Sequence, residues 1–95
     1  MANKPYTELF NDTNDGTVEF AHPGGRGRDD LLIDTSGVGV CEVRTKCHPD
    51  GNYKAAVTLT NDDQIVIAYA PFYELACTGV AGTFIVAAGL GEGGQ

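Results

Sequence analysis

Residues 38–60 have the sequence VGVCEVRTKCHPDGNYKAAVTLT, which carries the clearest structural pattern of the chain. From Val38 to Lys46 the side chains alternate between two faces, as in a strand with one buried side. The turn-forming segment His48-Pro49-Asp50-Gly51-Asn52 follows, in which Pro fixes φ and Gly accepts a positive φ. Residues 53–60 alternate again, so the stretch predicts a β-hairpin. The face expected to meet the core carries Cys41, Val43, Thr45 and Cys47.

Further short strands are predicted on both sides of this hairpin, separated by turn-forming residues. They comprise 17–20, 31–35, 64–69, 72–78 and 83–88. The run Ile65-Val66-Ile67 does not alternate and is expected to be buried on both faces. No apolar pattern of helical spacing extends over ten residues. About six or seven short strands joined by turns predict an all-β fold, either an antiparallel β-sandwich or a small partly open barrel.

The length of 95 residues allows one domain, which we place at residues 17–90. Residues 1–16 are rich in Asn and Asp, and we expect them to form an irregular N-terminal arm. Residues 91–95 are expected to be a flexible Gly-rich tail. The chain begins without the apolar segment of a secretory signal, and no apolar run approaches the roughly 20 residues that span a bilayer. We therefore expect neither secretion by a signal peptide nor a membrane partner.

The charge is strongly acidic, with 6 basic and 13 acidic residues and a net charge of -7. Binding of nucleic-acid phosphates requires a positively charged stripe, so nucleic acid is not expected as a partner. Two of the basic residues, Arg26 and Arg28, lie in the Gly-rich loop GGRGR. Arginine is favoured at protein interfaces, so we expect this pair to contact a protein surface.

The three cysteines cannot all pair within one chain, which argues against a disulfide-stapled secreted scaffold. Cys41 and Cys47 lie on one predicted strand, about 20 Å apart. Because a disulfide requires Cα atoms within about 7 Å, these two cannot pair along a straight strand. Cys77 can bridge to one of them only if their strands are neighbours, and the sequence leaves this open.

Two segments contain side chains that metals bind, but neither has the spacing of a metal site. Cys47-His48 adjoins a turn without the close pairs typical of structural zinc. Asn11-Asp12-Thr13-Asn14-Asp15-Gly16 is similar to the beginning of an EF-hand calcium loop, yet its twelfth position is His22 rather than a bidentate Glu. We predict no metal site and expect a solvated turn at residues 11–16.

Catalytic motifs are also missing from the sequence. The cysteine, histidine and serine residues lack the local contexts that mark activated nucleophiles. The acidic doublets Asp29-Asp30 and Asp62-Asp63 lie in predicted turns, where exposure to solvent explains them. We predict no catalytic residue and no cofactor, and we expect that the protein is not an enzyme.

Three blocks in the second half of the chain form a recognisable pattern: LTNDDQIVI (59–67), PFYELACTG (71–79) and AGTFIV (81–86). In this pattern the chain resembles small β-rich virion proteins of tailed bacteriophages. In such proteins a polar turn, an apolar strand, a Pro-Phe corner and a Gly-Thr strand often close the domain. The resemblance implies a capsid decoration (cement) protein, often trimeric, that sits on the shell and clamps neighbouring major capsid subunits.

We therefore predict a phage capsid decoration protein that is made in the host cytoplasm and located on the capsid surface. It is expected to be a homo-oligomer, and its partner is expected to be the major capsid protein or another virion protein. The residues predicted to contact the partner are Tyr6, Leu9, Phe10, Arg26, Arg28, Phe72 and Tyr73.

Two other functions remain open from the sequence. One is a different virion accessory, at the tail, the neck or the head–tail joint. The other is a carbohydrate-binding β-sandwich, in which Tyr69, Phe72 and Tyr73 would stack against sugar rings.

Overall fold

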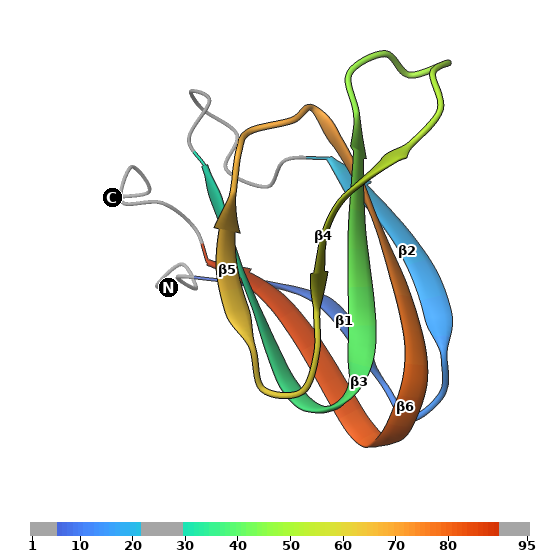
Figure 1. Ribbon diagram of the computed structural model, residues 1–95, viewed down its shortest axis with the longest axis vertical. Coiled ribbons are helices and arrows are strands. Elements are labelled where there is room, and N and C mark those ends of the chain that lie inside the picture. Colours follow the sequence, from blue (N-terminus) through green and yellow to red (C-terminus); the bar gives the residue numbers. More distant parts are fainter. Residues whose placement is uncertain (1–5, 22–29, 90–95) are drawn as a thin grey trace, which may run out of the picture.

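Six antiparallel strands make up the part of the chain that the computed structural model describes, residues 6–21 and 30–89 (Figure 1). They are β1 (Tyr6–Asp12), β2 (Gly16–Ala21), β3 (Leu31–Lys46), β4 (Lys54–Leu59), β5 (Gln64–Ile67) and β6 (Phe72–Gly89). The described residues contain no helix. The prediction of an all-β fold is confirmed, and the predicted hairpin of residues 38–60 is formed by β3 and β4.

The two long strands β3 and β6 form the centre of the single sheet. They pair from Leu32 opposite Gly89 to Lys46 opposite Phe72. β1 and β2 follow one another along the outer edge of β6, and β5 and β4 do the same along β3. The sheet is therefore four strands wide, and each edge strand is interrupted halfway along.

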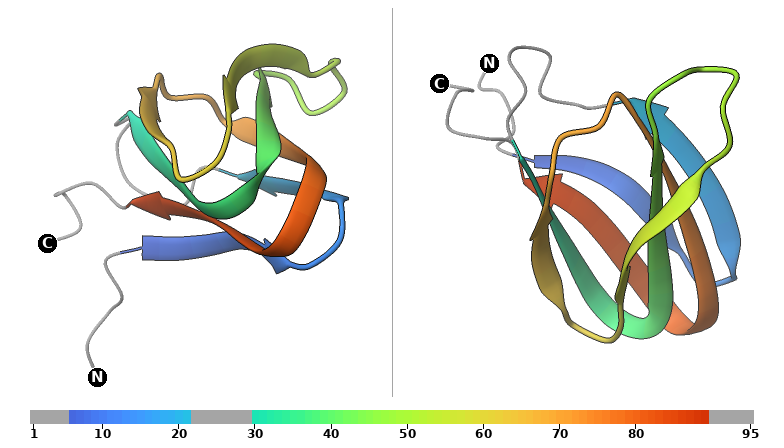
Figure 2. Two further views of the ribbon diagram at one scale, coloured as in Figure 1. Left: turned by 60° about the horizontal axis from the view of Figure 1, so that its bottom comes forward. Right: turned by 45° about the horizontal axis from the view of Figure 1, so that its top comes forward.

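Both long strands bend near their midpoints, so that the sheet folds over onto itself (Figure 2). The β3–β6 register shifts between Ser36 and Val40, and Gly37, Gly79 and Gly82 have φ values of 105°, 61° and 74°. One half contains β1, β5 and the adjoining parts of β3 and β6, and we call it the β1/β5 half. The other, the β2/β4 half, contains β2, β4 and the remaining parts of the long strands.

The predicted division of β3 and β6 into two strands each is wrong. Ser36-Gly37 and the residues 79–82 bend the backbone without reversing the chain, because the strand continues to pair with its neighbours on both sides of the bend. A glycine with positive φ turns the local backbone, but only the neighbouring strands decide whether the chain turns back.

The bend in β3 is held by the polar turn between β4 and β5. The backbone N–H groups of Gly37 and Gly39 donate to the side-chain oxygens of Asp62 and Asn61, each at 3.0 Å. Buried Thr35 donates from its hydroxyl to the carbonyl of Thr60 at 2.7 Å and accepts from the Asp63 amide at 2.8 Å. The acidic doublet Asp62-Asp63 was expected to be only a solvated turn. Together with Asn61 it instead provides partners for backbone groups that the bend would leave unpaired.

The bend in β6 is held in a similar way by the break between β1 and β2. The N–H group of Val80 donates to Asp15 Oδ1 at 3.0 Å. In both long strands, an acidic or amide side chain from the neighbouring interrupted edge strand thus caps the bend.

The core lies between the inner faces of the two halves. Eleven apolar side chains of the described residues are less than 2% exposed: Tyr73, Phe84, Leu31, Ile33, Leu59, Leu75, Val43, Val86, Cys41, Cys77 and Ala88. The predicted core positions Cys41 and Val43 are confirmed. Thr45 is only half-buried and Cys47 is exposed, because the hairpin between β3 and β4 extends beyond the folded sheet (Figure 1).

Two predictions about local structure need correction. Residues 6–12 are not an irregular arm but strand β1, because Phe10 packs edge to face on Phe84 and the backbone pairs with β6. The run Ile65-Val66-Ile67 is not buried on both faces, because β5 lies at the edge of the sheet. Only Ile67 is buried, whereas Val66 is 58% exposed.

The connection between β5 and β6 crosses the end of the folded sheet and is anchored by Tyr73. The Ala70 amide donates to the Tyr73 phenol oxygen at 2.9 Å, and this hydroxyl donates to the Ala68 carbonyl at 3.4 Å. The fully buried Tyr73 ring stacks on Phe20 with centroids 4.9 Å apart. The crossing segment is therefore anchored to the core through the hydroxyl group of Tyr73.

Candidate interaction surface

A row of apolar residues crosses the outer face of the β1/β5 half. Directly opposed residues of an antiparallel ladder point to the same face of the sheet. The register places Tyr6 opposite Gly89, Gly89 opposite Leu32, and Leu32 opposite Val66. We call these four residues the apolar row.

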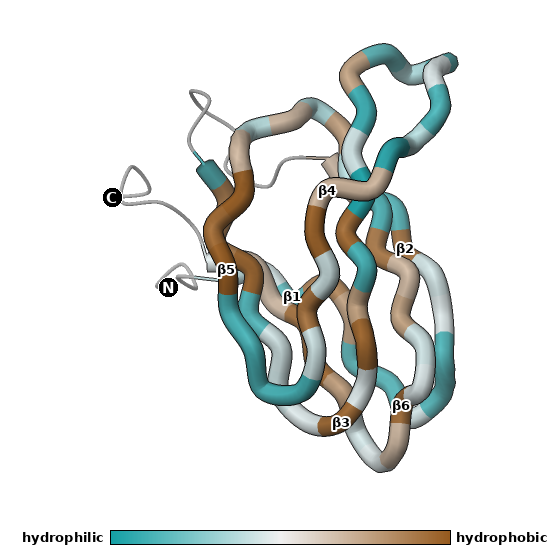
Figure 3. Tube along the Cα trace, viewed as in Figure 1, coloured by the Kyte–Doolittle hydropathy of each residue, from teal (hydrophilic) through white to brown (hydrophobic). Residues whose placement is uncertain are grey.

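The apolar row is open to solvent at both of its ends. Val66 is 58% exposed and Tyr6 is 43% exposed, while Leu32 and Gly89 are half-buried. Leu32 lies over Gly89, because a Cβ atom added there would be 3.2 Å from Leu32 Cδ2. Figure 3 shows the hydrophobic character of β5 in this part of the molecule.

The next row on the same face is polar and acidic apart from one alanine. It consists of Glu8, Ala87, Asp34 and Gln64 in register order. Gln64 Nε2 donates to Asp34 Oδ2 at 2.9 Å, so this amide holds the carboxylate beside the apolar row. Both charged side chains of these two rows are acidic.

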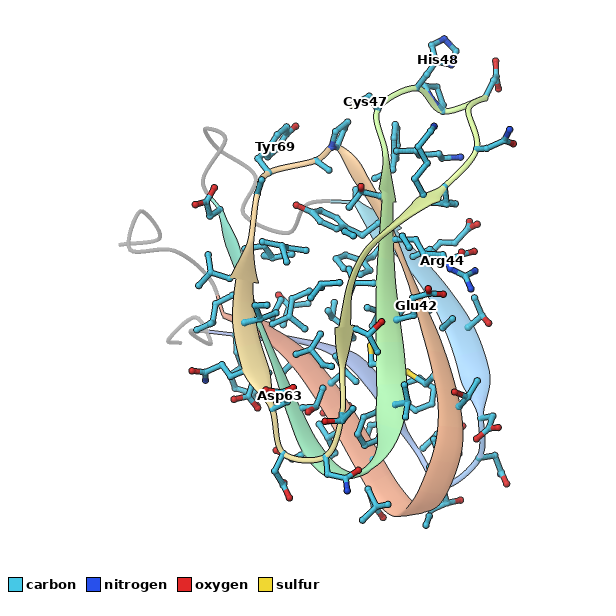
Figure 4. All side chains as sticks on the ribbon, in the orientation of Figure 1. Glu42, Arg44, Cys47, His48, Asp63 and Tyr69 are labelled. Carbon is cyan, nitrogen blue, oxygen red and sulfur yellow. The ribbon has the colours of Figure 1, made fainter. Side chains whose placement is uncertain are left out.

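The outer face of the β2/β4 half is charged at the corresponding place. There Glu19 lies opposite Glu74, Glu74 opposite Arg44, and Arg44 opposite Ala55. We call these four residues the charged row. Arg44 pairs with Glu74 at 2.9 Å and with Glu42 at 2.6 Å. Figure 4 shows Arg44 beside Glu42. The hydrogen bonds that Arg44 donates to Glu42 and Glu74 raise the pKa of Arg44.

Lysine and aromatic side chains lie next to the charged row. Lys46 Nζ lies 4.5 Å from the centroid of the Tyr53 ring and 5.8 Å from that of Phe72. It also donates to the Pro49 carbonyl at 2.8 Å. The ammonium group thus lies near the half-buried Phe72 ring, and its contacts are made within the chain.

The structure does not bring the predicted partner-binding residues together. Tyr6 is exposed in the apolar row, whereas Phe72 lies on the outer face of the other half. Phe10 is 7% exposed and Tyr73 is 0% exposed, so their rings belong to the core and are not available to a partner. Leu9 is partly buried and packs against the same core.

Arg26 and Arg28 lie outside the described residues. The expected sugar-stacking platform of Tyr69, Phe72 and Tyr73 lacks one of its rings at the surface, because Tyr73 is buried.

The sequence did not indicate Val66 and Leu32 as surface residues. Their apolar neighbours suggested a buried strand, and the edge position of β5 is not visible in the local pattern.

The segments considered for metal binding make other contacts. Asp12 Oδ1 accepts from the Thr13 amide at 2.6 Å, and His48 Nδ1 accepts from the Asp50 amide at 3.0 Å. Cys47 and His48 lie on the exposed hairpin loop (Figure 4). Within residues 6–21 and 30–89, no group of three or more His, Cys, Asp or Glu side chains is placed to hold a metal ion.

Comparison with known proteins gives no relative for this chain: no protein-family model, no curated protein and no solved structure matches it. In the described part of the chain there is also no helix long and apolar enough to cross a membrane.

Proposed function

We propose that this protein is a non-enzymatic structural subunit that binds a larger protein through its apolar row. In the specific form implied by the sequence resemblance, it is a capsid decoration protein bound to the major capsid protein of a tailed bacteriophage. The observation that carries the proposal is the exposure of Val66, at 58%, beside Leu32 and Gly89 on the outer face of the sheet.

The position of the apolar row favours a protein partner. Contiguous exposed apolar surface bordered by polar residues is typical of protein interaction sites. β5 is an edge strand, and in the described chain its ladder partner is β3 alone. A partner can therefore cover Val66 with apolar side chains and also pair with the edge of β5.

The charges around the apolar row indicate the chemistry of this partner. Glu8 and Asp34 lie in the adjacent row, and the whole chain has a net charge of -7. Two copies joined through this face would bring like charges together. We infer a partner with an apolar centre and Lys or Arg around it, so that opposite charges meet at the rim.

The proposal is tested by cosedimentation of the purified protein with undecorated shells of a purified major capsid protein. The wild-type protein should saturate the shells at a shell-wide copy number. Val66→Lys should bind about 10- to 100-fold more weakly, because it places a charge where apolar contact is expected. The matched control is Thr58→Lys, which adds the same charge to an exposed position on the β2/β4 half.

Equal binding by the two variants would remove the apolar row from the mechanism. Saturation at a few copies per particle would favour the tail or neck alternative. Light scattering of the free protein measures whether it is the homo-oligomer that the sequence predicts.

A further inference from the structure

Two of the three cysteines face one another across the two central strands. Cys41 on β3 is the direct register partner of Cys77 on β6. The two side chains share the inner face of the sheet and are 0% and 1% exposed. The sequence could not decide whether Cys77 pairs with a cysteine, and this register selects Cys41.

The distance across the ladder suits a disulfide. Directly opposed residues of an antiparallel pair have Cα atoms about 4.5–5.5 Å apart, inside the range of about 4.4–6.8 Å for disulfides. The next inner pair towards the hairpin, Val43 opposite Leu75, is also fully buried and keeps the two strands in register. Closing the bond therefore requires little backbone movement.

The two thiols already contact each other in the reduced protein. A side-chain hydrogen bond between them raises the pKa of Cys41 and lowers the pKa of Cys77. This is the pattern expected when the Cys41 S–H group donates to the Cys77 sulfur. Of the two thiols, Cys77 is therefore the one that deprotonates more readily.

We propose that Cys41 and Cys77 form a reversible cross-strand disulfide when the protein meets a low-molecular-weight disulfide such as oxidised glutathione. The Cys77 thiolate attacks one glutathione sulfur, forming a mixed disulfide and releasing one glutathione thiolate. The Cys41 thiol then loses its proton and attacks the Cys77 sulfur, releasing the second glutathione thiolate. The protein loses two hydrogen atoms, and one glutathione disulfide is reduced to two thiols.

The remaining cysteine does not take part in this bond. Cys47 is exposed on the hairpin loop, about 20 Å along the strand from Cys41. Since the buried pair is covered, exchange has to proceed through local opening of an edge strand or during folding. The proposal rests on the β3–β6 register and is independent of the proposed function.

The test is to refold the reduced protein in oxidised glutathione, quench it with acid and alkylate it in denaturant with iodoacetamide. Intact mass should show one alkylated cysteine instead of three, and peptide mapping should show Cys41 linked to Cys77. The bond closes a loop of about 36 residues, so Tm should rise by about 10 °C or more and fall back with dithiothreitol.

Cys47→Ala is the matched variant and should keep both the mass change and the shift in Tm. Cys77→Ala should lose both, and if that variant fails to fold, the Cys47→Ala protein still decides the question. Three alkylated thiols after refolding, a glutathione adduct confined to Cys47, or a bridge that includes Cys47 would each overturn the proposal.

Discussion

The two outer faces of the folded sheet are built from the same two long strands but differ in chemistry. On the β1/β5 half the apolar row leaves Val66 open to solvent. On the β2/β4 half the charged row is joined by the ion pairs of Arg44 with Glu42 and Glu74. The inner faces of both halves have to be apolar because they share one core. The outer faces are free of that requirement, so the two halves can differ in their outer chemistry while sharing one apolar core.

The bends in β3 and β6 turn the outer faces of the two halves away from each other. Gly37 has a φ of 105°, and a Cβ atom added there would collide with the carbonyl oxygen of Thr83. Gly37→Ala should therefore give the largest effect, a loss of about 3 kcal/mol or more in the free energy of unfolding. Urea denaturation followed by circular dichroism measures this loss.

The matched control for the bend is Gly79→Ala. Gly79 has a φ of 61°, but nothing lies within 4 Å of an added Cβ atom. Only the backbone conformation is then unfavourable, and the expected loss is about 1 kcal/mol. Equal losses for the two variants would mean that the β3 bend is not held by this close contact.

A smaller effect is expected at Tyr73, which anchors the segment crossing from one half to the other. Tyr73→Phe leaves the Ala70 amide without its acceptor, so stability should fall by about 1–3 kcal/mol at pH 7. Burial raises the pKa of Tyr73 above its usual range near 10.

The sign of the pH effect at Tyr73 follows from this raised pKa. The folded protein favours the neutral phenol, so its contribution is complete below the unfolded pKa near 10 and is lost as pH rises towards the folded value. The stability difference between the wild-type protein and Tyr73→Phe should therefore stay constant up to about pH 10 and shrink as the pH rises further. Urea midpoints across this range test it, and parallel profiles would contradict it.

The smallest effects are expected from single changes on the two outer faces themselves. Arg44→Met leaves Glu42 and Glu74 without their cation, next to Glu19. The Tm of this variant should therefore lie below that of the wild-type protein at low ionic strength, and the difference should shrink at about 1 M salt. Val66→Thr should change stability by less than about 0.5 kcal/mol at any salt concentration, because Val66 packs little within this chain. Thermal melts of both variants at two salt concentrations test the contrast. A loss of stability in Arg44→Met that does not depend on salt, or a large loss of stability in Val66→Thr, would contradict the expected difference between the two outer faces.

The candidate surface was only partly predictable from the sequence. Tyr6 was expected to contact a partner and lies in the apolar row, but Phe10 and Tyr73 were expected there too and are buried. All three are aromatic residues beside polar ones, so local composition does not separate them. Exposure depends on which strands lie on either side, and this is set by residues far away in the chain.

The sequence by itself determined the strand character of the chain, because the alternation of residues 38–46 and 53–60 is a local property of each strand. It also determined the hairpin, through the turn chemistry of His48–Asn52. Only the tertiary structure decided that β3 and β6 continue through their bends, that β5 lies at an edge, and that Cys41 lies opposite Cys77. The physical reason is that pairing joins strands distant in sequence, and the burial of a side chain depends on those neighbours rather than on its own strand.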